Sequence, residues 1–306
     1  MKIVAISPSF SNNIVLQNET YKYFPDAKLN LEGKRFKKSE LIEFIGDADG
    51  VIVGLERIDE ELITLCSNLK IVSKYGVGLN NIDLNACYNR DIKIGWTGGV
   101  NKLSVAEMTL GYMLMLIRNI YCTSNELKNG TWNKSGGNQL SNKTIGIIGV
   151  GHIGKEVIRL LEPFKCKILV NDIINQSNYY ISNNLIQVTK DEIFKTCDIV
   201  SIHTPFDETT SDMVDINVLK TMKSTSFLIN SARGGIINEN DLKYALQNKL
   251  ILGAAIDAYI EEPPLDKEML SLPNLICTPH IGGNAKEAVE AMGLSAIKHV
   301  KEFFNK

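Results

Sequence analysis

Residues 143–172 hold the pattern that most restricts what this chain can fold into. An apolar run at residues 144–148 leads into GVGHIG at residues 149–154, and a helical pattern and a second apolar run then end at Asp172. A strand, a glycine turn, a helix, a second strand and an acid in this order are typical of a dinucleotide-binding βαβ unit. The glycine spacing alone would also fit a Gly-rich turn that binds nothing.

Each glycine of this turn has an expected physical role. Gly149 would allow the tight turn, Gly151 would let the backbone approach a pyrophosphate, and Gly154 would let the helix pack on the strand. His152 and Ile153 then lie at the helix N-terminus, where unpaired N–H groups and a partial positive charge favour phosphates.

The acid that ends the pattern indicates which cofactor is bound. Asp172 stands where a carboxylate can accept hydrogen bonds from the adenosine ribose hydroxyls. Ile173, Ile174 and Asn175 follow it, without an Arg to pair with a 2′-phosphate. We therefore expect NAD rather than NADP.

Composition and charge narrow the classes of protein to which this chain can belong. The chain has 306 residues, enough for two domains, and its net charge of −2 gives no electrostatic reason to bind nucleic acid or anionic membranes. Its six cysteines lack paired or metal-ligand spacing, so we expect reduced thiols, no disulfides and no metal site. The N-terminus lacks a signal-peptide core, and the apolar stretch at residues 108–117 is too short for a bilayer. We expect a cytoplasmic protein.

Short β-type runs alternate with helical patterns along most of the chain, which predicts an α/β fold with parallel sheets. Strands are expected at residues 2–7, 50–53, 70–74, 92–94, 144–148, 198–203, 226–230, 253–257 and 275–278. The helix expected at residues 102–118 is apolar nearly all round, with Ser104 and Glu107 as a capping box, which suits a link between domains or a dimer interface. A last amphipathic helix at residues 284–304 would return to the first domain.

The ends of the later strands carry candidate catalytic groups. Arg233 would hold a substrate carboxylate in a forked pair, and His280 would exchange a proton with the neighbouring oxygen. Glu262 would orient that imidazole and favour its protonated form. Each residue singly has an ordinary surface-loop explanation, but together they suit reduction of a 2-keto acid. His203 precedes Thr204-Pro205 and is expected beside a ribose rather than in acid/base chemistry.

Several spaced motifs resemble the D-isomer-specific 2-hydroxyacid dehydrogenases, and among them the short forms of D-3-phosphoglycerate dehydrogenase. The motifs are KYGVGLNNID, NKLSVAE, GIIGVGHIG with Asp172, HTP, INSARGG, AAIDAYIEEPP and TPHIGG. The resemblance implies two Rossmann-like domains with parallel sheets: a flavodoxin-like substrate domain at residues 1–100 plus 285–306, and an NAD-binding domain at residues 101–284. It also implies a homodimer built on the helix at residues 102–118.

The resemblance assigns roles to individual residues. Arg233, Glu262 and His280 take the catalytic positions, Asp257 would hold the nicotinamide carboxamide, and the amides near Val77 would bind the substrate carboxylate. Cofactor contacts are expected at Gly149, Gly151, His152, Ile153, Gly154, Asp172, Thr204, Pro205, Ser231, Ala232, Arg233, Asp257, His280 and Gly282, and substrate contacts at Lys74, Val77, Gly78, Arg233 and His280.

Two departures concern the substrate. Phosphoglycerate dehydrogenases commonly place a phosphate-binding Arg after the strand at residues 50–53, where this chain has Gly54-Leu55-Glu56; Lys74, Arg57 or Lys102 could substitute. The segment Trp96-Thr97-Gly98 lacks the Pro that often follows the Thr. An unphosphorylated acid such as glyoxylate, hydroxypyruvate or lactate is thus favoured over phosphoglycerate. The alternatives are an NAD(H)-sensing binding protein of the corepressor type, and formate or phosphite oxidation, against which Glu262 counts.

Overall fold

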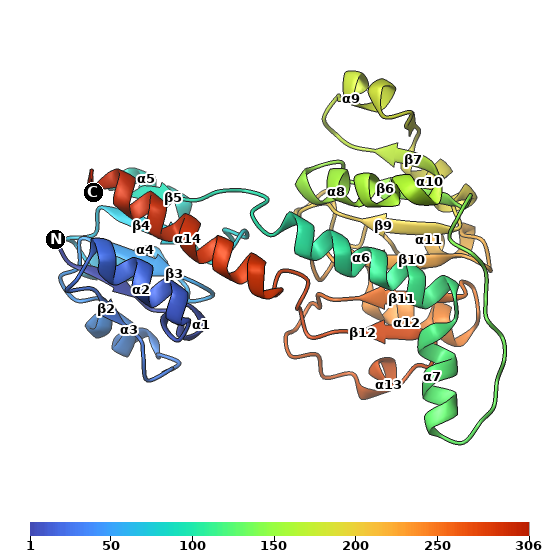
Figure 1. Cartoon of the computed structure of the whole chain (residues 1–306), viewed down its shortest axis with the longest axis horizontal. Coiled ribbons are helices and arrows are strands. Elements are labelled where there is room, and N and C mark those ends of the chain that lie inside the picture. Colours follow the sequence, from blue (N-terminus) through green and yellow to red (C-terminus); the bar gives the residue numbers. More distant parts are fainter. Residues whose placement is uncertain (306) are drawn as a thin grey trace. The chain divides into compact units, whose positions relative to one another are not determined.

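The computed structural model describes residues 1–305, which fold as two compact units (Figure 1). Unit 1 consists of Met1–Asn101 together with the segment that begins at Asn284, and unit 2 consists of Lys102–Gly283. The role that the sequence suggests for unit 1, substrate binding, remains a prediction.

Unit 1 is built on a five-stranded parallel sheet in the order β2-β1-β3-β4-β5. This is the flavodoxin-like order, in which the direction of winding changes beside the first strand. The strands are β1 (Ile3–Ala5), β2 (Lys28–Leu29), β3 (Gly50–Val53), β4 (Ile71–Lys74) and β5 (Lys93–Gly95), and the helices are α1 (Pro8–Ser11), α2 (Ile14–Tyr23), α3 (Lys38–Ile45), α4 (Glu60–Leu65), α5 (Leu84–Asn89) and α14 (Lys286–Phe303).

Alternation along the strands of unit 1 supplies a core on each face of the sheet, because successive strand side chains point to opposite faces. Val4 packs with Leu41 of α3 in one cluster. Ile3 packs on the other face with Leu16 of α2 and Ile297 of α14. The C-terminal helix α14 therefore completes the core of unit 1, although it follows unit 2 in the chain.

Unit 2 contains a seven-stranded parallel sheet in the order β12-β11-β10-β9-β6-β7-β8. Its strands are β6 (Thr144–Ile148), β7 (Lys167–Asn171), β8 (Ile186–Gln187), β9 (Ile199–Ile202), β10 (Phe227–Asn230), β11 (Gly253–Ile256) and β12 (Leu275–Cys277). Counted from β6, this is the dinucleotide-binding order 3-2-1-4-5-6 with one further strand. The winding reverses between β6 and β9, and such a fold binds ligands at the carboxyl ends of these strands. The predicted α/β class with two parallel sheets is confirmed.

Helices cover both faces of the sheet in unit 2. The helices of unit 2 are α6 (Lys102–Ile117), α7 (Ile120–Lys128), α8 (His152–Leu161), the short 3₁₀ helix η1 (Glu162–Phe164), α9 (Ser177–Ser182), α10 (Lys190–Thr196), α11 (Ile216–Thr221), α12 (Glu239–Gln247) and α13 (Lys267–Leu270). Helices α6 and α8 pack with Ile145 and Ile147 of β6 on one face. Phe194 of α10 and Leu242 of α12 pack with Val200 of β9 on the other.

The capping box expected at the start of α6 is wrong. The helix begins at Lys102, so Ser104 lies within its first turn, and the Ser104 hydroxyl donates to the carbonyl oxygen of Gly282 at 2.5 Å. The side chain thus joins two segments of unit 2 that are distant in sequence. Local pattern alone did not indicate this partner.

Within residues 1–305, no helix has both the length and the apolar composition that crossing a bilayer requires. The same residues contain no cluster of three His, Cys, Asp or Glu side chains placed to hold a metal ion. The six cysteines are free thiols. Burial raises the pKa of Cys87 to about 11 and that of Cys197 to about 12, so these two thiols are poor nucleophiles at neutral pH.

Candidate active site

The glycine turn after β6 has the geometry that a close ligand approach requires. Gly149 has φ +93°, and a Cβ there would lie 2.7 Å from the carbonyl carbon of His203. A Cβ on Gly154 would lie 2.1 Å from the carbonyl oxygen of Gly149, whereas one on Gly151 would meet nothing within 4 Å. Close packing thus requires glycine at positions 149 and 154, whereas the space beside Gly151 is open. No side chain caps α8, which begins at His152.

Asp172 follows β7 directly and lies beside this turn. Its Oδ2 accepts a hydrogen bond from the Val150 N–H at 2.6 Å, and its Oδ1 accepts one from the Ile174 N–H at 2.8 Å. A carboxylate has about four acceptor positions, so positions remain for ribose hydroxyls. The exposed side chains of Ile173 and Ile174 bring no positive charge to this edge.

The end of β9 carries polar atoms that lack partners. His203 Nδ1 and Thr204 Oγ1 are buried, and no hydrogen bond satisfies either atom in the described part of the chain. His203 Nε2 lies 2.9 Å from Ser201 Oγ, and burial lowers the pKa of this imidazole to about 4, so it is neutral at physiological pH. Buried polar atoms without partners are rare. A bound dinucleotide, with its ribose and phosphate groups, would satisfy both, and the residues present fit such a cofactor.

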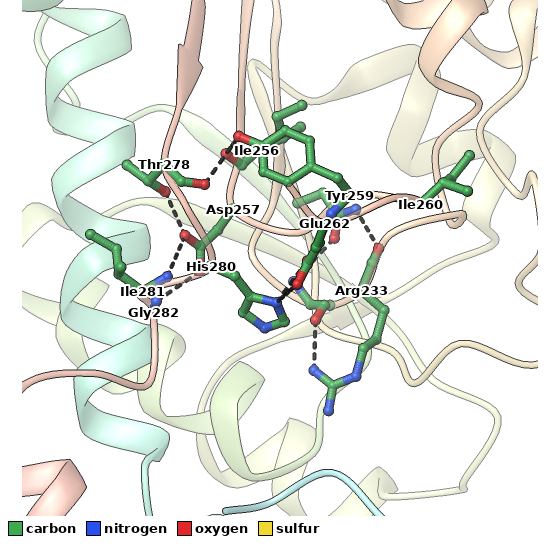
Figure 2. A network of polar contacts seen from close by, with 12 residues as sticks. Arg233, Ile256, Asp257, Tyr259, Ile260, Glu262, Thr278, His280, Ile281 and Gly282 are labelled. Atoms are coloured by element: carbon green, nitrogen blue, oxygen red, sulfur yellow. Dashed lines mark hydrogen bonds and ion pairs between the residues drawn. The ribbon is translucent and has the colours of Figure 1, made fainter. Parts of the chain in front are cut away.

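Glu262 and His280 form a direct pair in unit 2. His280 Nδ1 lies 2.8 Å from Glu262 Oε1 and 2.9 Å from Oε2 (Figure 2). The carboxylate stabilises the tautomer with its proton on Nδ1 and, more strongly, the imidazolium. Both side chains stay accessible, at 44% and 41% exposure, as groups that meet a substrate must.

The Asp257 carboxylate holds the loop after β12 in place. This buried carboxylate accepts hydrogen bonds from the Ile281 N–H at 2.9 Å, the Gly282 N–H at 2.8 Å and the Thr278 hydroxyl. His280 in the same loop has φ +52°, a left-handed conformation that costs a non-glycine residue free energy and persists where the surroundings impose it. Asp257 therefore fixes the loop that carries the imidazole, and one acceptor position remains for the carboxamide expected there.

Arg233 is placed by the loop after β10. A Cβ on Gly234 would lie 2.0 Å from the carbonyl carbon of Tyr259, so this loop packs directly against the segment that carries Glu262. The Tyr259 N–H in turn donates to Glu262 Oε1 at 3.2 Å. The preceding Ser231 is held through its hydroxyl, 2.9 Å from Thr109 Oγ1 of α6.

The Arg233 guanidinium is a partly buried cation. Nη1 donates to the Ala232 carbonyl at 2.7 Å, and no carboxylate lies within ion-pair distance of it among residues 1–305. Burial lowers its pKa from the ordinary value, while the charge of Glu262 acts in the opposite direction. In Figure 2 the guanidinium and the His280 imidazole extend toward the same side of their loops. Unit 2 thus brings Arg233, Glu262 and His280 together, with donors left for an anion.

Three residues of unit 1 are expected to contact substrate. Lys74 is the last residue of β4, and Val77 and Gly78 lie in the loop that follows. Lys74 is buried, and its Nζ donates to Asn81 Oδ1 at 2.7 Å and to the Gly54 carbonyl. Asn81 was not singled out from the sequence. Its position after the glycine loop was the only available signal, and its role as a partner of Lys74 depends on the fold.

The substitutes for a phosphate-binding Arg are engaged elsewhere. The Gly54 N–H donates to Glu56 Oε2 at 2.9 Å, which brings a carboxylate to the end of β3. Arg57 is exposed and lies 3.9 Å from Asp59, and Lys102 pairs with Glu156 at 3.1 Å. The end of β3 therefore carries a negative side chain.

The chain resembles known proteins along nearly its whole length. It is 34% identical to human D-3-phosphoglycerate dehydrogenase over 266 residues, which cover 86% of the chain and 50% of that protein. It is 32% identical to hydroxypyruvate reductase of Thermotoga maritima over 279 residues, covering 89% of the chain and 90% of that protein. The chain spans about half the length of the phosphoglycerate dehydrogenases that it matches.

A solved structure shares the fold of the entire chain. NAD-dependent formate dehydrogenase from Staphylococcus aureus, in complex with NAD, has a TM-score of 0.83 and 30% identity, with 100% of this chain and 96% of that one covered. Residues 110–282 match the model of the D-isomer specific 2-hydroxyacid dehydrogenase NAD binding domain. This chain therefore belongs to the D-isomer specific 2-hydroxyacid dehydrogenase family and carries its NAD-binding domain.

Proposed function

We propose that the protein is an NAD-dependent dehydrogenase that interconverts a D-2-hydroxy acid and its 2-keto acid. The observation that carries the proposal is the His280–Glu262 pair at 2.8 Å, beside the Arg233 guanidinium, in a unit that matches an NAD-binding domain. Bound NAD would supply the hydride acceptor or donor. Side chains of this chain would supply the proton and the anion binding.

Arg233 would bind the substrate carboxylate, because its partly buried guanidinium retains donors in a forked geometry. His280 would give its Nε2 proton to the substrate oxygen during reduction and take it back during oxidation. Glu262 would hold the ring through Nδ1 and stabilise its charged form. Asp172 would bind the adenosine ribose, and Asp257 would accept from the nicotinamide carboxamide.

We propose a small unphosphorylated substrate, such as hydroxypyruvate or glyoxylate. The Glu56 carboxylate at the Gly54 N–H would repel a phosphate at the end of β3, and Lys74 is already bonded to Asn81. One relative is named hydroxypyruvate reductase, which agrees with this choice. Others are named D-3-phosphoglycerate dehydrogenase, so phosphohydroxypyruvate belongs in the same assay.

We also propose that the protein is a cytoplasmic homodimer. Six free thiols suit a reducing compartment. None of the nine residues of α7 is buried in the single chain. A second copy would cover this surface, and sedimentation analysis of the purified protein would measure the assembly.

The activity is tested by mixing the protein with NADH and a panel of 2-keto acids and following the absorbance of NADH. Turnover of an unphosphorylated acid is expected, as is loss of most activity in His280→Ala with NADH binding intact. NADH binding without turnover of any panel member would instead favour a non-enzymatic NAD(H)-sensing protein. Formate belongs in the oxidative panel with NAD, because a structural relative is a formate dehydrogenase.

A further inference from the structure

Trp96 lies beside the proposed carboxylate-binding loop of unit 1. It follows β5 directly, and β5 pairs in parallel with β4, whose end leads into residues 75–78. The Trp96 indole N–H donates to the main-chain carbonyl oxygen of Val77 at 2.8 Å. The Trp96 residue is otherwise 41% exposed. A large aromatic side chain with one donor is therefore bonded to the middle of the loop.

This hydrogen bond fixes the direction of a peptide group. In a trans peptide the C=O of one residue and the N–H of the next point in opposite directions. With the Val77 carbonyl held by the indole, the Gly78 N–H must point away from Trp96. Glycines at positions 76 and 78 leave the backbone free to rotate, and Gly76 already has φ +138°. The hydrogen bond from the indole thus restrains a loop backbone that its own glycine-rich sequence leaves flexible.

The position of Trp96 is in turn fixed by α14. A Cβ on Gly95 would lie 2.6 Å from the Cβ of His299, so the end of β5 packs directly on this helix. Thr97 Oγ1 lies 2.8 Å from His299 Nε2 and accepts from the Ser295 hydroxyl at 3.0 Å. The residues on both sides of Trp96 are therefore anchored, which fixes the main chain from which the indole extends.

We propose that Trp96 is a positioning residue for substrate binding: its indole N–H holds the Val77–Gly78 peptide so that the Gly78 N–H is presented to the carboxylate of a 2-keto acid. The inference rests on the proposed dehydrogenase function. It assigns to Trp96 a role in substrate affinity and none in proton transfer or NAD binding.

The test is Trp96→Phe, which keeps an aromatic ring and removes the donor. The KM for the 2-keto acid should rise about three- to tenfold, the ratio expected for one neutral hydrogen bond. The kcat at saturating substrate and the Kd for NADH should stay near their original values. Trp132→Phe is the matched control, because that residue is 77% exposed and lies in unit 2. An unchanged KM in an active Trp96→Phe protein would overturn this inference and leave the proposed function intact.

A spectroscopic readout decides the matter if Trp96→Phe folds poorly. The chain has two tryptophans, so the Trp132→Phe protein reports on Trp96 alone. Oxalate, a two-carboxylate analogue of the substrate, is titrated into this protein with NAD present. A saturable change in emission is expected. Binding of oxalate detected by calorimetry without any change in emission would refute a loop held by Trp96, whereas absence of both turnover and oxalate binding would refute the dehydrogenase proposal itself.

Discussion

The substitution Glu262→Gln removes the negative charge of the residue that pairs with His280 and keeps the shape of its side chain. The amide retains an oxygen that can accept from Nδ1, so the ring keeps its orientation, but the negative charge is lost. Two unit charges about 3 Å apart attract by roughly 1.4 kcal/mol in a water-like dielectric. Because the two side chains are 44% and 41% exposed, solvent screens the pair, and we take about 1 kcal/mol as the stabilisation of the imidazolium.

This value corresponds to a change in rate of about fivefold. Oxidation of the 2-hydroxy acid leaves its proton on the ring, so the loss of the negative charge beside the ring should slow this direction. Initial rates of NAD reduction at saturating 2-hydroxy acid, measured at one neutral pH, give the comparison. Glu261→Gln is the control, since its exposed side chain precedes Glu262 in the same loop. A Glu262→Gln rate equal to that of the control would refute the charge argument.

Three further variants test residues of unit 2 that are expected to lie at the NAD site. Asp172→Ala removes the acceptor for the Val150 and Ile174 amides; NADH should bind about tenfold or more weakly in a fluorescence titration, and equal affinity would exclude the ribose role. Gly154→Ala places a Cβ 2.1 Å from a carbonyl oxygen, so a lower melting temperature and lost NADH binding are expected, and unaltered values would contradict the packing argument. For His203 the folded pKa is about 4 against an ordinary 6.5, so the unfolded chain protonates first. Unfolding free energy should fall as pH drops from about 6.5 toward 4, by up to about 3 kcal/mol, and denaturant titrations should show a smaller fall in His203→Gln.

Much of the fold could be predicted because buried parallel strands have a strong sequence signal. The strands at residues 50–53 and 144–148 were placed at their observed bounds, since each is a short apolar run ended by a glycine turn. Helix α2 and strand β2 were missed. Helix α2 carries few apolar residues in register, and only Leu16 and Thr20 are buried, so its stability depends on packing against the rest of unit 1.

The part of the candidate site that lies at strand ends could be predicted from the sequence. Arg233, Glu262 and His280 all follow strands of one sheet, and a parallel sheet brings such ends to one edge. Their catalytic roles stay predictions. Asn81 and Trp96 were not found from the sequence, because each acts through a hydrogen bond to a residue whose position depends on tertiary folding.

The sequence by itself determined the α/β class, the glycine turn with its acid at residue 172, and the residue types available at the strand ends. These features are local, since each depends on spacing within a few residues or on a run of apolar side chains. Only the tertiary structure decided that Asp257 holds the His280 loop, that Ser104 donates to the Gly282 carbonyl, and that an indole restrains the peptide after Val77. Hydrogen bonds between residues distant in sequence leave no periodic pattern, because their partners meet only when the chain has folded.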